Sequence, residues 1–246
     1  TAVLTSQTGF KSFYCNDCTD KLDYYTSEWK KLGFQPDGIY TGFLSSEKQV
    51  DKILDFINSF ETENTLVLVD PVMGDGGRTY SLFTDALACK MKKLVTVADV
   101  ITPNLTECCI LCDVDYCEFI KNADKPDFMD KIAELGKNLL NRYGVKIVII
   151  TGIDHKDIDG TMYVQNLIAS KDEVFSVSCK KIGGSYSGTG DLFASVMFSG
   201  LLRGDTLRDT VSLAVKFIET SLRDTVALGI DRNEGIEFEK HLKILL

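Results

Sequence analysis

Basic residues are scarce in this chain relative to acidic ones. It carries 27 Lys and Arg against 36 Asp and Glu, which gives a formal net charge of -9. Nucleic acids and anionic membranes attract proteins through a basic surface. Long apolar runs are lacking too, because stretches such as residues 145–150 are far too short to cross a bilayer. We therefore expect no nucleic acid and no membrane among the partners.

Several motifs of nucleotide-binding and hydrolytic enzymes are also missing. The chain has no Walker A sequence and no Gly-x-Gly-x-x-Gly after an early strand. It has no Gly-x-Ser-x-Gly elbow, which argues against an α/β-hydrolase. Its two histidines, His155 and His241, stand in polar surroundings, where we expect surface side chains rather than ligands or bases. Acidic and glycine-rich motifs are left as the candidates for chemistry.

Eight cysteines are present and need an explanation. Cys15 and Cys18 form one Cys-x-x-Cys pair, and Cys109 and Cys112 form another, so a zinc site or a disulfide is one interpretation. The pairs lie about ninety residues apart, and the second pair falls in an expected amphipathic helix. Buried free thiols, which behave as small hydrophobes in a reducing compartment, are the favoured interpretation. They indicate a cytoplasmic protein.

Apolar strand-like runs alternate with helical patterns along the 246 residues. This alternation predicts a three-layer α/β/α fold, with a mostly parallel central sheet and helices on both faces. We find no linker or repeat, so residues 1–246 are expected to form a single domain. The expected strands are 38–43, 65–69, 99–102 and 146–151, followed by antiparallel strands at 161–165 and 173–178. The expected helices are 48–60, 130–143, 189–203, 207–227 and a short one near the C-terminus.

The start of the chain resembles the end of a buried strand. Residues 1–4, Thr-Ala-Val-Leu, have no initiator methionine and no polar lead-in. We therefore expect the natural protein to have an upstream segment that includes the first strand of the sheet.

A glycine-rich turn precedes an apolar helix late in the chain. Residues 188–191 read Gly-Thr-Gly-Asp and lead into Leu-Phe-Ala-Ser-Val-Met. Glycines allow a tight turn that exposes several N–H groups at the positive end of the helix dipole, which suits a phosphate. The carboxylate of Asp191 could accept a proton from an attacking hydroxyl group. A plain turn in which Asp191 caps the helix would explain the same residues.

Other polar residues follow the expected parallel strands. Asp70 and Asp75 come after the strand at 65–69 and could hold Mg²⁺, although ordinary turn residues would also fit. Asn104 and Glu107 follow the next strand in the spacing of a capping box. Ligands of open parallel sheets bind outside the carboxyl ends of the strands. We expect these side chains, with Thr151 and Gly152 after a further strand, to point to one crevice.

These four motifs in this order resemble the ribokinase-like superfamily. They are Asp-Pro-Val-Met-Gly-Asp at 70–75, Thr-Pro-Asn-x-x-Glu at 102–107, Thr-Gly at 151–152 and Gly-Thr-Gly-Asp at 188–191. Within the superfamily, the chain resembles the pyridoxal kinase family. Residues 5–10, Thr-Ser-Gln-Thr-Gly-Phe, are similar to the family's substrate loop. The resemblance covers essentially the whole chain. It implies an ATP-dependent kinase that phosphorylates the hydroxymethyl group of pyridoxal, pyridoxine or pyridoxamine.

The resemblance also implies roles for individual residues, with ATP, Mg²⁺ and a monovalent cation such as K⁺ or Na⁺ as cofactors. Asp191 would be the catalytic base, and the backbone N–H groups around it would stabilise the transferred charge. It further implies a cytoplasmic homodimer. The implied sets are Gly188, Thr189 and Gly190 for the anion hole, Asn104, Glu107, Thr151, Gly152 and Asp70 for ATP, Asp70, Asp75, Thr102 and Glu107 for the metal, and Gln7, Thr8 and Phe43 for the substrate.

Two departures from the family's pattern leave other interpretations open. Gln7 stands where the family usually has His, and no counterpart of the family's first strand is present. Gln is frequent at this place in hydroxymethylpyrimidine phosphate kinases, but their glycine turn typically ends in Cys where this chain has Asp191. A hydroxymethylpyrimidine (phosphate) kinase is therefore the alternative enzyme. A non-catalytic nucleotide-binding or vitamer-binding protein is the alternative of another class.

Overall fold

A computed structural model describes residues 3–6 and 8–246, and these residues form two compact units. The first unit comprises residues 3–6, 14–150 and 168–174 of the described chain. The second comprises residues 8–13, 151–167 and 175–246. Each unit is assembled from three segments, so the units do not follow one another along the chain. The single domain expected from the sequence stays a prediction.

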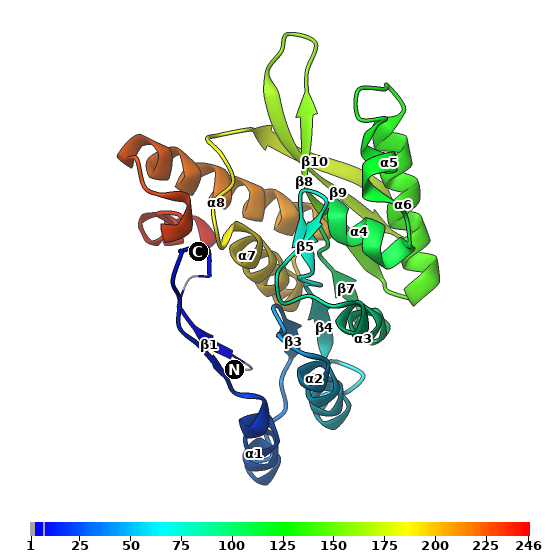
Figure 1. Ribbon diagram of the computed structural model, residues 1–246, viewed down its shortest axis with the longest axis vertical. Coiled ribbons are helices and arrows are strands. Elements are labelled where there is room, and N and C mark those ends of the chain that lie inside the picture. Colours follow the sequence, from blue (N-terminus) through cyan, green and yellow to red (C-terminus); the bar gives the residue numbers. More distant parts are fainter. Residues whose placement is uncertain (1–2, 7) are drawn as a thin grey trace. The chain divides into compact units, whose positions relative to one another are not determined.

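The first unit is built on parallel strands (Figure 1). Strands β3 (Gly38–Thr41), β4 (Leu66–Val69) and β7 (Val100–Ile101) pair in parallel, and β7 pairs in parallel with the start of β8 (Ile147–Lys156). The central side chains of β4, β7 and the start of β8 are fully buried, as expected for strands of an α/β fold. The register aligns Thr41 with Val69, and Val69 with Ile101. The carboxyl ends of three neighbouring strands therefore reach the same level.

Several helices of the first unit begin at side-chain caps. Ser46 caps α2 (Glu47–Phe60), Thr84 caps α3 (Asp85–Val95) and Asn104 caps α4 (Leu105–Cys112), each by accepting a backbone N–H bond. Such a cap typically stabilises a helix by about 1 kcal/mol. The remaining elements of this unit are α1 (Thr19–Lys31), α5 (Tyr116–Ile120), α6 (Phe128–Tyr143) and two short antiparallel ribbons, β1 (Val3–Thr5) with β2 (Cys15–Asp17) and β5 (Gly74–Asp75) with β6 (Arg78–Thr79).

The second unit contains most of the later strands and the C-terminal helices. Strand β8 is followed by β9 (Met162–Ser170) and β10 (Val174–Lys180) through turns too short for anything but antiparallel neighbours. The hydrogen-bonded order of the long sheet is β10-β9-β8-β7-β4-β3. Helices α7 (Thr189–Arg203) and α8 (Leu207–Leu228) pack on each other, and 3₁₀ helices η1 (Arg232–Glu234) and η2 (Glu239–Leu245) follow them.

Most expected elements are present, with specific corrections. The parallel strands and the long helices are confirmed, and α7 has the predicted bounds. The start of the chain was expected to be a buried strand; residues 1–2 lie outside the described residues, but β1 is mostly exposed and pairs only with β2 in its ribbon. The expected short C-terminal helix is a 3₁₀ helix, η2. Helices α1 and α3 and the β5–β6 hairpin were missed.

Among residues 3–6 and 8–246, no helix has both the length and the apolar character that a bilayer crossing requires. The longest helix, α8, is amphipathic and buries one face within its unit. This finding agrees with the short apolar runs of the sequence.

The cysteines differ in burial, and Cys112 and Cys179 are intermediate. Cys18, Cys108 and Cys109 are buried as expected, whereas the expectation of burial is wrong for a second group: Cys15, Cys89 and Cys117 are exposed. Burial raises the pKa of the Cys109 thiol to about 11, so little of the reactive thiolate exists there at neutral pH. Exposed and buried thiols should therefore differ in reactivity.

A brief pulse of a water-soluble maleimide at pH 7 is expected to label the exposed thiols Cys15, Cys89 and Cys117 while leaving Cys108 and Cys109 unmodified. The buried pair should react only after denaturation. Mass spectrometry of the peptides, with the denatured chain as the positive control, measures the extent at each site. Labelling of Cys108 as fast as that of Cys89 would contradict the burial of α4.

Candidate active site

Three polar residues of the first unit gather where neighbouring strands end. Thr41 closes β3, Asp70 follows β4, and Thr102 follows β7. Their exposed fractions are 6%, 9% and 4%, respectively. Among the described residues, the buried hydroxyl oxygens of Thr41 and Thr102 have no hydrogen-bond partner. Because a buried hydroxyl without a partner is costly, these two atoms indicate a place where a ligand, an ion or water completes the structure.

The strand-end residues fit a hard cation such as Mg²⁺. Magnesium prefers oxygen ligands and is usually held through one or two carboxylates together with substrate phosphates. The carboxylate of Asp70 and the unpartnered hydroxyl of Thr102 are oxygen donors of this kind. Asp75, on the exposed β5–β6 hairpin, adds a second carboxylate in the same unit. Thr41 was missed by the sequence-based reasoning, since a threonine inside a strand pattern carries no signal of its own.

Asn104 and Glu107 form the capping box that their spacing predicts. The Asn104 Oδ1 atom accepts from the Glu107 backbone N–H at 3.1 Å, and the Glu107 Oε2 atom accepts from the Asn104 N–H at 2.8 Å. Both side chains also reach the turn after β4: Glu107 Oε1 accepts from the Met73 N–H at 2.9 Å, and Asn104 Nδ2 donates to the Gly74 carbonyl at 2.7 Å. The structure thus ties these two residues to the loop that carries Asp75.

The carboxyl group of Glu107 is buried beside another carboxyl group. Only 3% of the residue is exposed. Burial first, and then the negative charge of Asp70, raise the pKa of Glu107 to about 8. Hydrogen bonds from backbone N–H groups act in the opposite direction without overcoming burial. Two acidic residues of the predicted site are therefore near enough to repel each other, an arrangement that a bound cation would relieve.

The glycine turn lies in the second unit and opens α7. Gly188 is the N-cap with φ of 82°, a left-handed conformation that favours glycine. It makes no side-chain cap bond, and Asp191 lies three residues further, in the first turn of the helix. Asp191 is therefore not the N-cap that the alternative interpretation required. The first N–H groups of a helix have no acceptor within the helix, so the backbone at 189–191 suits an anion.

Thr151 and Gly152 belong to β8, in the part of this strand that lies in the second unit. Gly152 has φ of 69°, and its N–H donates to the Asn166 side chain at 3.3 Å. The positive φ turns the strand at this point, which a residue with a side chain would do under strain. The role of Thr151 and Gly152 as nucleotide contacts stays a prediction.

The expected substrate loop reaches the same C-terminal segment as the glycine turn. A Cβ atom on Gly9, next to Thr8, would lie 2.2 Å from the Asn233 Oδ1 atom, so the loop packs closely on η1. The Ser187 N–H, just before the glycine turn, donates to the Arg232 carbonyl at 3.0 Å. Gly9, next to Thr8, and Ser187, just before the glycine turn, thus both contact η1 within the second unit. The segment at 232–233 was missed, because its sequence resembles an ordinary polar loop.

Two further substrate predictions have a more limited outcome. Phe43 lies after β3 in the first unit, and 38% of the residue is exposed. Gln7 lies outside the described residues. The roles of both residues stay predictions.

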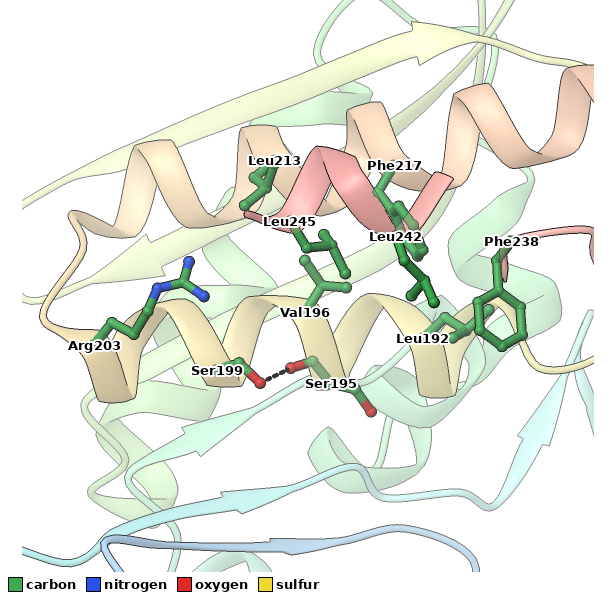
Figure 2. A pocket seen from close by; sticks show the side chains of 10 residues that line it. All are labelled: Leu192, Ser195, Val196, Ser199, Arg203, Leu213, Phe217, Phe238, Leu242 and Leu245. Carbon is green, nitrogen blue, oxygen red and sulfur yellow. Dashed lines mark hydrogen bonds between the residues drawn. The ribbon is translucent and has the colours of Figure 1, made fainter. Parts of the chain in front are cut away.

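The second unit also carries a shallow apolar groove between α7, α8 and η2 (Figure 2). Figure 2 shows aliphatic and aromatic side chains from the three helices facing it, with Arg203 at one end. Ser195 and Ser199 lie along its edge, and the Ser199 hydroxyl donates to the Ser195 carbonyl at 2.7 Å. None of the predicted catalytic residues lines this groove. Its lining residues are Leu192, Ser195, Val196, Ser199, Arg203, Leu213, Phe217, Phe238, Leu242 and Leu245.

Comparisons with known proteins agree on one family. A model of the phosphomethylpyrimidine kinase family matches residues 29–235. A Schizosaccharomyces pombe protein assigned as a pyridoxal kinase is 29% identical over 171 residues, which cover 68% of this chain and 47% of that protein. A hydroxymethylpyrimidine/phosphomethylpyrimidine kinase from Staphylococcus aureus is 27% identical over 198 residues, which cover 80% of this chain and 66% of the relative.

A solved structure agrees with these relatives. A Bacteroides thetaiotaomicron protein, assigned as a phosphomethylpyrimidine kinase and crystallised with pyridoxal, is 35% identical, with a TM-score of 0.89. The match covers 99% of this chain and 83% of that one. The shared α/β fold has a mostly parallel central sheet with helices on both sides, which confirms the predicted fold class.

The chain spans 47% to 66% of the length of three curated relatives that it matches. The family model nevertheless covers the motifs at 70–75, 102–107, 151–152 and 188–191. The chain belongs to the phosphomethylpyrimidine kinase family, and its predicted likeness to the pyridoxal kinases of the ribokinase-like superfamily is confirmed.

Proposed function

We propose that this chain phosphorylates the hydroxymethyl group of pyridoxal, pyridoxine or pyridoxamine with ATP. The observation that carries the proposal is Asp191 in the first turn of α7, directly after the left-handed Gly188 cap. A carboxylate beside the N–H groups of a helix start supplies both a base and an anion site, the two groups that phosphoryl transfer to an alcohol requires. Asp at this position, in place of Cys, supports pyridoxal-type acceptors over the pyrimidine.

The proposed reaction moves one proton and one phosphoryl group. The Asp191 carboxylate takes the proton of the acceptor hydroxyl as the hydroxyl oxygen attacks the γ-phosphorus of ATP. The bond between this phosphorus and the β,γ-bridging oxygen breaks, and ADP leaves. The N–H groups of Thr189 and Gly190 would stabilise the negative charge on the transferred group.

Nucleotide and metal binding complete the proposal. A bound Mg²⁺ would neutralise charge on the phosphate oxygens, and Asp70, Asp75 and Thr102 supply oxygen atoms that fit it. Asn104, Thr151 and Gly152 are proposed to contact ATP, while Glu107 acts through the loop and cap that it holds. A monovalent cation and a homodimer stay predictions from the family resemblance.

The second candidate is hydroxymethylpyrimidine or phosphomethylpyrimidine kinase activity. It is favoured by the matching family model and by the Staphylococcus aureus relative. The Bacteroides protein, in contrast, is assigned to the pyrimidine activity but was crystallised with pyridoxal. Both acceptors are aromatic heterocycles with a hydroxymethyl arm, so Asp191 would have the same role in either reaction.

Steady-state ADP release with a panel of acceptors distinguishes the candidates. We expect turnover with Mg²⁺-ATP and at least one of pyridoxal, pyridoxine and pyridoxamine, with a kcat/KM at least tenfold above that for hydroxymethylpyrimidine. A reaction without acceptor corrects for ATP hydrolysis, and mass spectrometry identifies the phosphorylated product. The reverse preference would establish the pyrimidine kinase. Binding of ATP or a vitamer by calorimetry without any turnover would overturn both enzymes in favour of a binding protein.

A further inference from the structure

The β5–β6 hairpin places Asp75 at a defined point. Its two strands pair Gly74 with Thr79 and Asp75 with Arg78, and two glycines form the turn between them. Gly76 and Gly77 have φ of 57° and 78°, as a two-residue type I′ turn requires. Asp75 is thus the last strand residue before the turn, and its Oδ1 atom accepts from the Gly76 N–H at 2.8 Å.

A hairpin with two residue pairs is not stable by itself, so its position depends on what surrounds it. The start of α4 holds its base, where Asn104 and Glu107 bond to the backbone of Gly74 and Met73. The same helix also holds its tip. The Thr106 hydroxyl, on a residue that is 4% exposed, accepts from the Gly77 N–H at 2.9 Å.

Tyr116 contacts the tip from α5. A Cβ atom on Gly77 would lie 2.5 Å from the Tyr116 Cδ1 atom and 2.7 Å from Cε1, so the ring packs directly against the glycine backbone. No side chain fits there, and the positive φ of Gly77 would strain one in any case. The hairpin tip is therefore held by a hydroxyl group and an aromatic ring from two different helices.

We propose that Thr106 and Tyr116 are positioning residues that fix the hairpin tip and thereby the orientation of the Asp75 carboxylate. Nothing in the motif pattern assigns them a function, because the motif residues Asn104 and Glu107 hold only the base. Thr106 and Tyr116 fix the turn immediately after Asp75. A carboxylate that is oriented before its ligand arrives loses less freedom on binding, so these contacts favour binding of a divalent cation by Asp75.

Only the cation-binding role of Asp75 rests on the proposed function. Hydrogen exchange of the backbone amides tests the contacts of Thr106 and Tyr116 directly and needs no enzymatic activity. In Thr106→Val the Gly77 N–H loses its acceptor while the side-chain shape is kept. We expect the backbone amides at 74–79 to exchange about tenfold faster than in the wild type, as loss of one partly buried hydrogen bond implies. Thr106→Ser should restore the wild-type rate, and Tyr116→Ala should accelerate exchange in the same peptide.

Thr84→Val is the matched control. Thr84 also accepts a backbone N–H bond, from Leu87 at 3.0 Å, and lies in the same unit, but at the start of α3. This variant should lose stability without faster exchange at 74–79. Wild-type exchange at 74–79 in Thr106→Val would overturn the proposal, as would equal acceleration there in the Thr84→Val control.

A kinetic measurement tests the consequence for the cation. We expect Thr106→Val to raise the free Mg²⁺ concentration for half-maximal ADP release several-fold, with the KM of the vitamer unchanged and Thr106→Ser close to wild type. If Thr106→Val and Thr84→Val need the same free Mg²⁺ concentration for half-maximal ADP release, the hairpin contacts do not affect cation binding and this part of the proposal is overturned. If the wild-type protein has no turnover at all, the proposed function fails, while the exchange experiment still decides whether Thr106 and Tyr116 hold the hairpin.

Discussion

Asp191→Asn is expected to lower kcat for phosphoryl transfer by about 10²–10⁴-fold, the range typical of a lost general base. The amide keeps the size of the side chain but cannot take the proton of the acceptor hydroxyl at neutral pH. Because the backbone N–H groups of the α7 start remain, ATP affinity should change by less than about tenfold. Quenched-flow measurement of phosphorylated product, with calorimetric titration of ATP, separates the two effects.

Asp209→Asn provides a closely matched control for this change. Asp209 lies in the first turn of α8, as Asp191 does in α7, and both helices belong to the second unit. The control variant loses the same charge near a helix start, with the Thr206 hydroxyl as its former partner at 2.7 Å. It should keep kcat within about threefold of the wild type, since such a charge typically contributes only about 0.3–1 kcal/mol to stability.

A comparable loss of kcat in both variants would contradict the assignment of Asp191 as the base. It would indicate that each helix start, in α7 and in α8, needs its negative charge for folding. Retention of turnover in Asp191→Asn alone would place the proton acceptor elsewhere.

Features that depend on local patterns were predictable from the sequence. Helix α7 begins and ends where the glycine turn and Arg203 indicated, because a left-handed glycine at each end terminates the helix on both sides. The capping box of Asn104 and Glu107 followed from a spacing of three residues. In both cases the physical cause lies within a few residues of the feature, so a single sequence contains it.

Features that depend on distant partners were not predictable in this way. Glu107 bonds to Met73 across 34 positions, and Thr106 bonds to Gly77 across 29, so neither contact leaves a trace in the local pattern.

Helix α1 was missed for a related reason. It buries little beyond Thr19 and Leu22, and its aromatic residues stay exposed, so its apolar stripe is weak. Tertiary contacts position α1, whereas its own sequence signals it poorly.

The pH dependence of the unfolding free energy is expected to reveal the proton that Glu107 holds in the folded protein. Its pKa is raised from the ordinary 4.5 to about 8 in the folded protein, so the native state holds a proton that the unfolded chain has released between these pH values. Stability contributed by this group is therefore complete below about pH 4.5 and falls as pH rises toward 8. The slope approaches about 1.4 kcal/mol per pH unit, and the total loss over the shift from 4.5 to about 8 is about 5 kcal/mol.

Urea unfolding between pH 5 and 8.5, without divalent cations, measures this loss when the wild type is compared with Glu107→Gln. The amide resembles the protonated acid and cannot titrate, so the difference in unfolding free energy between the two proteins should shrink or reverse as pH rises. Glu118→Gln is the control, because Glu118 also lies three residues after a helix cap but is exposed. A pH slope identical in the wild type and Glu107→Gln would contradict a proton on Glu107. Burial and the charge of Asp70 jointly raise the pKa of Glu107, so Asp70→Asn should narrow the pH range over which stability falls and reduce the total loss.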